Sequence, residues 1–305
     1  MVRFIGRRVI YSLVVLLTTS FIVFGLSRAA GDPRNLFLTE YTTKETWDAW
    51  GREYNLDKPL VIQYVVWLGK ALRGDFGHSL RDHINALDVI MQRVPATLQL
   101  AGASFIAAIF IGVPLGVMSA VKRGTFWDYV GRTLALFGQA LPPYWLGVML
   151  ILLFAVSLDV LPSGRKGGID HYILPALTLG WGAASGLLRL TRSAMLEVLD
   201  SEYIKFARSK GVTASLVVWK HAFRNALIAP LTYSTLLLAG YLTGTVVTET
   251  VFSWPGVGRL AVTAVFNNDF PVLTGVVLIG TAVYLAVNLL TDVIYALMDP
   301  RIRFG

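Results

Sequence analysis

The side chains that most often do chemistry are scattered in this chain of 305 residues. Its four histidines, His78, His83, His171 and His221, share no helical face, and no HExxH pattern or metal-binding triad occurs. Cysteine is absent, which excludes disulfides and thiolate metal sites. The chain also lacks a GxxxxGK[ST] phosphate-binding loop, a GxSxG motif and paired carboxylates. These absences argue against a membrane-embedded enzyme, and they place any ATP hydrolysis on another polypeptide.

The most informative feature is a polar, basic stretch between long apolar segments, EYIKFARSKGVTASLVVWKHAFRNALIAP, which begins at Glu202. Ser201 is suited to cap a helix with this acidic residue in its first turn. Gly211 fits the left-handed residue that ends such a helix. Thr213 can then cap a second helix that continues to about residue 227. The sequence therefore predicts two helices joined by a tight corner.

On composition alone, this stretch is as typical of an ordinary helix–turn–helix that lies on the membrane surface as of a corner that grips a partner protein. His221 and Arg224 lie three residues apart on the second helix. We expect them either to face solvent and lipid headgroups, or to form ion pairs with Glu202 or with an acidic partner surface. Neither residue has the surroundings of a catalytic group.

The composition indicates an integral membrane protein. Hydrophobic residues make up 55% of the chain and charged residues only 15%, with a mean hydropathy of +0.60; about 25% charged residues is usual in a soluble domain. In a membrane protein, a net charge of +8 is typical of loops rich in Lys and Arg on the cytoplasmic side. No basic cluster lies on a soluble domain, so nucleic-acid binding is not expected.

A helix needs about 20 apolar residues to cross a bilayer core of about 30 Å. Six segments qualify, at about 9–29, 97–120, 132–157, 173–191, 229–251 and 271–297. The fourth carries Gly180, Gly182 and Gly186, whose spacing suits close helix packing. The first segment could instead be a signal peptide, but its apolar run is longer than a signal core, which favours a retained helix.

Lysine and arginine predict the orientation. With the N-terminus inside, the cytoplasmic side carries 15 of the 27 basic residues. The long segment 28–95 balances its basic residues with acidic ones and gives little topological signal. Six helices with both termini in the cytoplasm are therefore predicted.

The long outer segment, 31–95, is predicted to contain helices. Trp47, Trp50 and Tyr54 fall on one helical face, and Asp57-Lys58-Pro59 resembles a second helix start. This segment is expected to be a small helical cap on the outer helix ends or a docking surface for a substrate-delivering protein. The chain thus divides into residues 1–95, a membrane core at 96–298 that contains the polar loop at 192–228, and a cytoplasmic tail at 299–305.

Several segments carry a resemblance to one family. They are Gly31-Asp32-Pro33, LDKPLVIQYVVWLGKALRGDFGHSL at 56–80, RVPATLQL at 93–100, LPALTLG at 174–180, ETVFSWPGVGRLAVTAVFNNDFPVLTG at 249–275 and DVIYALMDPRIR at 292–303. Together with the stretch from Glu202, they resemble the B-type permease subunit of ATP-binding-cassette importers for dipeptides, oligopeptides, glutathione and nickel. The resemblance extends over essentially the whole chain, in order.

This resemblance implies the type I importer permease fold, with a cytoplasmic coupling helix, in a bacterial or archaeal inner membrane. It implies a heterodimer with a second permease, two cytoplasmic P-loop ATPases that bind ATP and Mg, and an extracytoplasmic binding protein. No cofactor is expected on this chain. Peptides are the favoured substrate because they are frequent in the family; nickel is disfavoured because no histidine or methionine cluster lines a span.

The resemblance assigns ATPase docking to the corner, where Ala207 is followed four residues later by Gly211. The wider superfamily often has Glu-Ala at the two positions before this alanine, and Lys205-Phe206 stands there here. The residues expected to dock the ATPase are Glu202, Tyr203, Ala207, Lys210, Gly211, His221 and Arg224.

Two other groups are expected at a gate or along the pathway. Pro142 and Pro143 must kink or interrupt the third span, either beside the pathway or as a purely structural bend. The loop residues expected to help close an outer gate are Trp254, Pro255, Gly256 and Gly258. Asn288 and Asp292 lie on one face of the last span, where a structural hydrogen bond is favoured over a functional role.

An ion-coupled secondary transporter is the alternative from a different class. Such proteins usually carry charged or discontinuous elements near the membrane midplane. No Asp, Glu, Lys or Arg falls near the middle of a predicted span. A protonophore would abolish uptake by a secondary transporter and spare an ATP-driven importer while ATP lasts.

Overall fold

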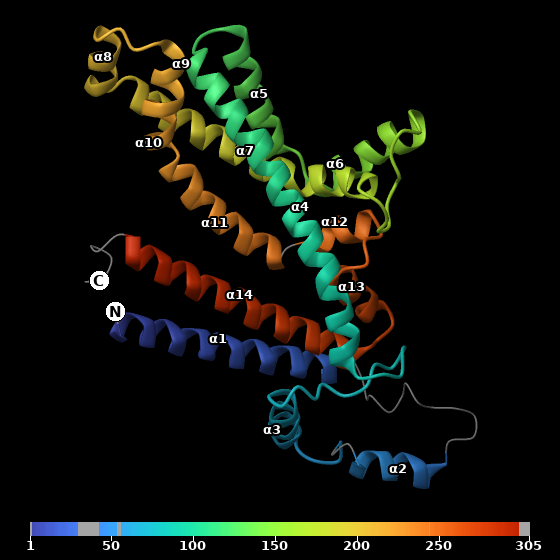
Figure 1. Ribbon diagram of the computed structural model, residues 1–305. Helices are drawn as coiled ribbons and strands as arrows, with labels where there is room; N and C mark the ends of the chain where they lie inside the picture. The colour runs from blue at the N-terminus through green and yellow to red at the C-terminus, as the bar shows by residue number, and fades with distance from the viewer. Residues whose placement is uncertain (1, 30–42, 54–55, 244, 299–305) are drawn as a thin grey trace. The chain divides into compact units, whose positions relative to one another are not determined.

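The computed structural model of the chain describes residues 2–29, 43–53, 56–243 and 245–298. Apart from an isolated bridge between His78 and Asn85, the regular structure in these residues is helical (Figure 1), which confirms the all-α class. The helices are α1 Val2–Ala29, α2 Lys44–Glu53, α3 Leu60–Ala71, α4 Ala86–Val121, α5 Phe126–Ala140, α6 Pro143–Leu150, α7 Asp170–Leu199, α8 Glu202–Ser209, α9 Ala214–Leu216, α10 Arg224–Ala226, α11 Ile228–Thr243, α12 Val246–Val251, α13 Val257–Phe266 and α14 Phe270–Met298. Two π-helical segments, Ile151–Ser157 and Val217–Phe223, continue α6 and join α9 to α10.

Four helices are long and apolar enough to cross a membrane, at Ile5–Ala29, Ala86–Val121, Asp170–Leu199 and Phe270–Leu290. They coincide with the first, second, fourth and sixth predicted spans. The third predicted span is a bent pair made of α5 and α6, and the fifth is divided between α11 and α12. The six-span count is therefore not confirmed, because the described residues contain four such helices, or five spans if the bent pair is one.

The bend in the third span lies at Pro142 and Pro143, as predicted. Helix α5 ends at Ala140, Pro142 is extended with a ψ of 135°, and Pro143 is the first residue of α6. The segments on either side meet at 109°. A proline ring disfavours the helical conformation in the residue before it, and proline is well suited to the first turn of a helix, so this pair fits the end of one helix and the start of the next.

The chain forms two compact units, one of residues Met1–Val94 and Leu260–Gly305, the other of residues Pro95–Arg259. In the first unit, α1 and α14 run side by side (Figure 1). Helix α3 packs on α1, where the rings of Phe24 and Trp67 lie 5.2 Å apart and the hydroxyls of Ser20 and Tyr64 are 2.7 Å apart. The helix predicted after Pro59 is confirmed, and its aromatic side chains favour the packed cap.

Helix α2 is also confirmed, at Lys44–Glu53. Of its predicted aromatic face, Tyr54 and the side chain of Trp50 lie outside the described residues. The Gly31-Asp32-Pro33 motif lies outside them as well.

The start of α14 is held by a buried carboxyl group. Asp269 Oδ1 accepts from the backbone N–H of Val272 (3.4 Å), as a helix cap, and Oδ2 accepts from Ser79 Oγ (2.5 Å). Both side chains are nearly inaccessible to solvent, and Ser79 Oγ also accepts from the N–H of Asp82. One aspartate thus joins the start of α14 to the turn that precedes α4.

We expect Asp269→Ala to destabilise the purified chain by about 2 kcal/mol, because it removes the cap and leaves the Ser79 hydroxyl without its acceptor. Thermal denaturation in detergent measures this. Asp82→Ala is the matched control. The Asp82 carboxylate is exposed, and its ion pair with Arg81 is long, at 4.0 Å, so its loss should change the stability little. Equal melting temperatures for the two variants would contradict the prediction.

In the second unit, α4 and α7 pack closely through small residues. A Cβ on Gly112 would lie 2.5 Å from the carbonyl oxygen of Ala184, and one on Gly116 would lie 2.7 Å from that of Leu188. The two glycines are four residues apart, as in the GxxxG pattern of membrane helices. The predicted packing role of glycines on α7 is also confirmed, because a Cβ on Gly180 would lie 2.8 Å from the carbonyl oxygen of Ser104.

Candidate functional site

The predicted corner is present and is closed by backbone hydrogen bonds. Helix α8 ends at Ser209, and Gly211 has a φ of +77°, which is the left-handed conformation that glycine adopts most easily. The N–H of Gly211 donates to Arg208 O (3.0 Å) and that of Val212 donates to Ala207 O (3.3 Å). This pair of bonds is the Schellman motif, which ends a helix and reverses the chain within two residues.

Ser201 lies at the cap position of α8, but its side chain does not cap the helix. Its hydroxyl donates instead to Val198 O (2.5 Å) in the last turn of α7. The predicted side-chain cap is therefore wrong. The backbone C=O of the preceding helix competes for a serine hydroxyl, and here it wins.

The second arm of the corner comprises α9, the π-helical segment and α10, and it ends where predicted, before α11 at Ile228. Pro230 lies in the first turn of α11, where proline is tolerated. The side chains beneath the two arms form one buried cluster with the ends of α4 and α7: Val117, Ala120, Met195, Ile204, Val217, Ala222 and Ala226. The corner is therefore packed directly on two membrane-spanning helices.

The residues expected to dock an ATPase lie together on this corner. Glu202, Tyr203, Lys210, Gly211 and Arg224 are exposed, and Ala207 and His221 are half-buried. Glu202 pairs with Lys205 at 2.7 Å. The alternative pairing of Glu202 with His221 or Arg224 is absent from the described side chains.

The corner also exposes apolar side chains that the docking set does not include. Phe206 is 60% exposed, with the Lys210 ammonium 4.4 Å from its ring centre, and Trp219 is 56% exposed. Aromatic rings are enriched at protein interfaces. In the sequence, Phe206 and Trp219 each lie two residues from an apolar residue that is buried, Ile204 and Val217. The sequence alone does not tell which of these apolar side chains face the core and which face outward.

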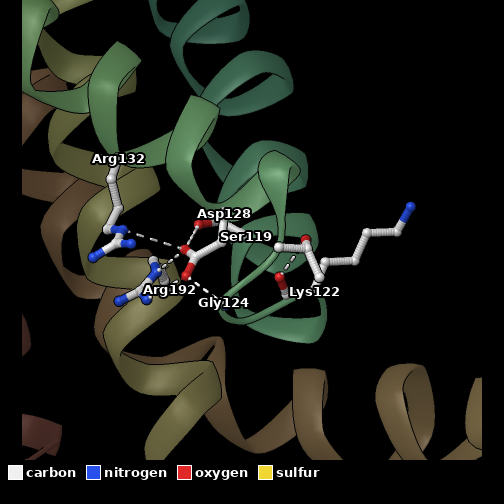
Figure 2. A network of polar contacts seen from close by, with 7 residues as sticks. Ser119, Lys122, Gly124, Asp128, Arg132 and Arg192 are labelled. Atoms are coloured by element: carbon white, nitrogen blue, oxygen red, sulfur yellow. Dashed lines mark hydrogen bonds and ion pairs between the residues drawn. The ribbon is translucent and has the colours of Figure 1, made fainter.

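A second polar cluster lies between α4, α5 and α7, with a carboxylate at its centre (Figure 2). Asp128 is 1% exposed. It accepts two hydrogen bonds from Arg192, from Nε to Oδ1 (2.8 Å) and from Nη2 to Oδ2 (3.0 Å). Ser119 Oγ donates to Oδ1 (2.7 Å) and the N–H of Gly124 to Oδ2 (3.0 Å), while Arg132 Nε lies 3.7 Å from Oδ1.

A third cluster holds the loop before α13. The carboxyl group of Glu249 is fully buried and accepts from Thr97 Oγ1 (2.8 Å), Thr245 Oγ1 (2.5 Å) and the N–H of Arg259 (2.9 Å). Thr97 Oγ1 in turn accepts from the N–H of Val257 (2.8 Å). Three segments of the second unit therefore meet at one side chain.

The four residues proposed for an outer gate are part of this cluster. Trp254 is fully buried, donates from Nε1 to Ala96 O (2.8 Å) and meets the ring of Tyr172 edge to face at 4.7 Å. A Cβ on Gly256 would collide with the Glu249 carboxyl group, and one on Gly258 with the backbone of Val246. Pro255, between Trp254 and Gly256, is half-buried.

The two proline positions lie close to this loop through α6. Pro142 and Pro143 are exposed, but a Cβ on Gly147, one turn further along α6, would lie 3.1 Å from the ring of Phe252. Helix α6 therefore packs against the end of α12. The structure brings the bend of the third span and the buried loop into one region of the second unit.

Neither Thr97 nor Asp128 stands out in the sequence, because each looks like an ordinary polar residue near a helix end. Arg192 follows the predicted fourth span, but α7 continues to Leu199 and includes it. In the last span, Asn288 is half-buried and the Asp292 side chain lies outside the described residues. Among the described side chains, no group of three or more His, Asp or Glu residues is placed to hold a metal ion.

Comparison with known proteins adds the family. Residues 112–304 match the model "Binding-protein-dependent transport system inner membrane component". Residues 1–101 match "Binding-prot-dependent transport system membrane comp, N-term".

Three relatives are similar along most or all of the chain. The oligopeptide transport system permease protein AppB of Bacillus subtilis is 36% identical, with 100% of both chains covered. The glutathione transport system permease protein GsiC of Salmonella choleraesuis is also 36% identical with 100% of both chains covered. The dipeptide transport system permease protein DppB of Escherichia coli is 37% identical over 82% of this chain and 83% of that protein.

Among solved structures, a chain of the MetNI methionine ABC transporter in an inward-facing conformation is similar, with a TM-score of 0.56 and 21% identity over 68% of this chain and 94% of that chain. This likeness supports the type I importer permease fold. Together with the family models and the relatives, it identifies the molecule. The chain belongs to the multi-pass inner-membrane permease components of binding-protein-dependent ABC importers, in the B-type branch that includes oligopeptide, dipeptide and glutathione permeases.

Proposed function

We propose that this chain forms half of a translocation pathway for di- or oligopeptides and is driven by separate ATPases that dock on its corner. The observation that carries the proposal is the corner itself, an exposed turn closed by backbone bonds and packed through Ile204 and Val217 on the ends of α4 and α7. A corner held in this way can transmit a displacement to α4 and α7, because close-packed interiors deform little.

The partners follow from the family. Two cytoplasmic P-loop ATPases would bind ATP and Mg, a second related permease would complete the pathway, and an extracytoplasmic protein would deliver the substrate. The relatives named for oligopeptide, dipeptide and glutathione transport support a peptide substrate. The corner and both chain termini would then lie in the cytoplasm, in agreement with the basic residues on that side.

In this mechanism, the ATPases close on ATP and carry the corner with them. Helices α4 and α7 follow because they share the buried cluster beneath the corner. The cavity between the two permeases then opens outward to receive substrate, and hydrolysis resets it. The buried loop at Trp254 and the bend at Pro142 are the proposed gate elements.

The test is the recovery of ATPases with the purified chain. We expect Gly211→Trp to abolish it, because a non-glycine residue costs about 1–2 kcal/mol at this φ and the indole would project from an open surface. Membrane insertion should be normal, since a Cβ at this position meets no atom within 4 Å. Mass spectrometry of proteins that co-purify from gently solubilised membranes measures recovery.

Gly211→Asn is the matched control, because asparagine tolerates the left-handed conformation. It should retain most of the ATPase recovered with the wild type. Normal recovery with Gly211→Trp would contradict docking at the corner. A wild-type chain that purifies without any ATPase would overturn the proposed function.

A further inference from the structure

The Asp128 cluster joins three helices with one buried side chain. Its hydrogen bonds come from Ser119 on α4, from the N–H of Gly124 in the turn, and from Arg192 on α7, while Asp128 itself lies in the first turn of α5. Figure 2 shows these groups converging on the carboxylate, whereas Lys122 points away from it. A bidentate arginine–carboxylate pair fixes the orientation as well as the distance of its two helices.

The cluster lies directly beside the core of the corner. On α4, Ser119 stands between Val117 and Ala120, and on α7, Arg192 lies one helical turn before Met195. Those three apolar residues belong to the buried cluster that holds the two arms of the corner. The helix segments that carry the corner therefore also carry the groups that hold Asp128.

Helix α5 leads from this cluster to the bend of the third span. It begins at Phe126 beside the cluster and ends at Ala140, just before the two prolines and α6. The corner contacts α4 and α7 through apolar packing. The start of α5 is joined to both of these helices at Asp128, the buried carboxylate on which the three helices converge.

We propose that Asp128, held by Arg192, is the positioning residue that makes α5 and α6 follow the coupling corner. This inference rests on the proposed function, since it assigns the route by which ATPase closure would reach the bend at Pro142. A buried ion pair is weak evidence for stability by itself, because desolvation opposes the attraction. Its value here is geometric, because it fixes the orientation of α5 relative to α7.

This chain lacks cysteine, so one introduced thiol can be followed on it in the full importer complex when the subunits are separated after labelling. Tyr144→Cys places one thiol on α6, at a side chain that is 57% exposed and next to the bend. Its rate of maleimide labelling is compared with and without ATP and vanadate, alongside ATPase recovery and hydrolysis. In the otherwise wild-type chain, we expect ATP to change the labelling rate by about threefold or more.

Adding Asp128→Asn should remove that change, while ATPase recovery and hydrolysis stay within about twofold of the wild type. Asp200→Asn is the matched control. It breaks the Arg123–Asp200 pair (3.2 Å), which joins the same turn to the end of α7 but is exposed on both sides. Exposed pairs contribute little, so the response of the label should remain.

The proposal is overturned if ATP still changes the labelling rate in the Asp128→Asn variant. It is overturned as well if ATP hydrolysis and thermal stability fall together with that change in labelling rate, because a purely structural role would have this effect. It is also overturned if ATP leaves the label unchanged in the wild-type background. Arg192→Lys keeps the charge but loses the bidentate geometry. If Asp128→Asn does not reach the membrane, the same labelling, hydrolysis and stability measurements on Arg192→Lys test the proposal. Failure of the wild type to recover ATPases is a separate result, which overturns the proposed function on which this inference rests.

Discussion

Gly116→Leu is expected to separate α4 from α7 and to lower the stability of the purified chain by about 3 kcal/mol. A Cβ at this position would lie 2.7 Å from the carbonyl oxygen of Leu188 and from the Cβ of Thr191. The first of these neighbours is backbone and cannot move aside as a flexible side chain would. Relief of the contact requires the helices to move apart, which disrupts the packing of Gly112 one turn away.

The matched control is Gly102→Leu on the same helix, where a Cβ meets no atom within 4 Å. Both substitutions replace a glycine of α4 with the same apolar residue, so helix propensity changes equally. Thermal denaturation in detergent, followed by size-exclusion chromatography, compares the two. Similar melting temperatures would show that α4 and α7 are not held together at Gly116.

Glu249→Ala is expected to destabilise the chain by about 3–5 kcal/mol, because it removes the acceptor of two buried donors and one half-buried donor and opens a cavity. The donors are the hydroxyls of Thr97 and Thr245 and the N–H of Arg259. Limited proteolysis of the loop around Trp254 should become faster, since the cluster that buries it is lost. The same denaturation assay gives the magnitude.

Glu249→Gln separates the effect of the hydrogen bonds from that of the volume, because it keeps an acceptor oxygen and nearly the same shape. It should lose about 1–2 kcal/mol and leave the loop resistant to protease. Equal losses for the alanine and glutamine variants would contradict the hydrogen-bond argument. A fully stable alanine variant would show that the loop is held by Trp254 and its apolar neighbours instead.

The parts of this molecule that the sequence predicts well depend on neighbouring residues. Gly211 ends α8 because the left-handed backbone conformation there is one that glycine itself favours. Pro142 and Pro143 break the third span because the proline ring restricts its own backbone and that of the preceding residue. Apolar length predicts four of the spans, since a bilayer imposes that length on each helix separately.

The parts that escape prediction depend on contacts between distant residues. Asp128 and Arg192 are 64 residues apart, and Thr97 and Glu249 are 152 apart. In one sequence, nothing distinguishes such partners from other polar residues near helix ends. The prolines favour a break but do not give its angle of 109°, and the two helices pack on distant elements, α5 and α6 on α7 and α6 also on α12. Ser201 shows that a local rule also fails when a second acceptor lies within reach.

The shape of the corner has a consequence for how such importers diversify. Its turn is closed by main-chain bonds and its arms are held by buried side chains, so the exposed side chains of Phe206 and Lys210 are not among those that hold the corner on α4 and α7. Under the docking proposed for the corner, mutations at these positions would alter the match to an ATPase subunit without refolding the membrane domain. Two permeases that arise by gene duplication would then acquire different ATPases, or come to share one, through a few surface substitutions.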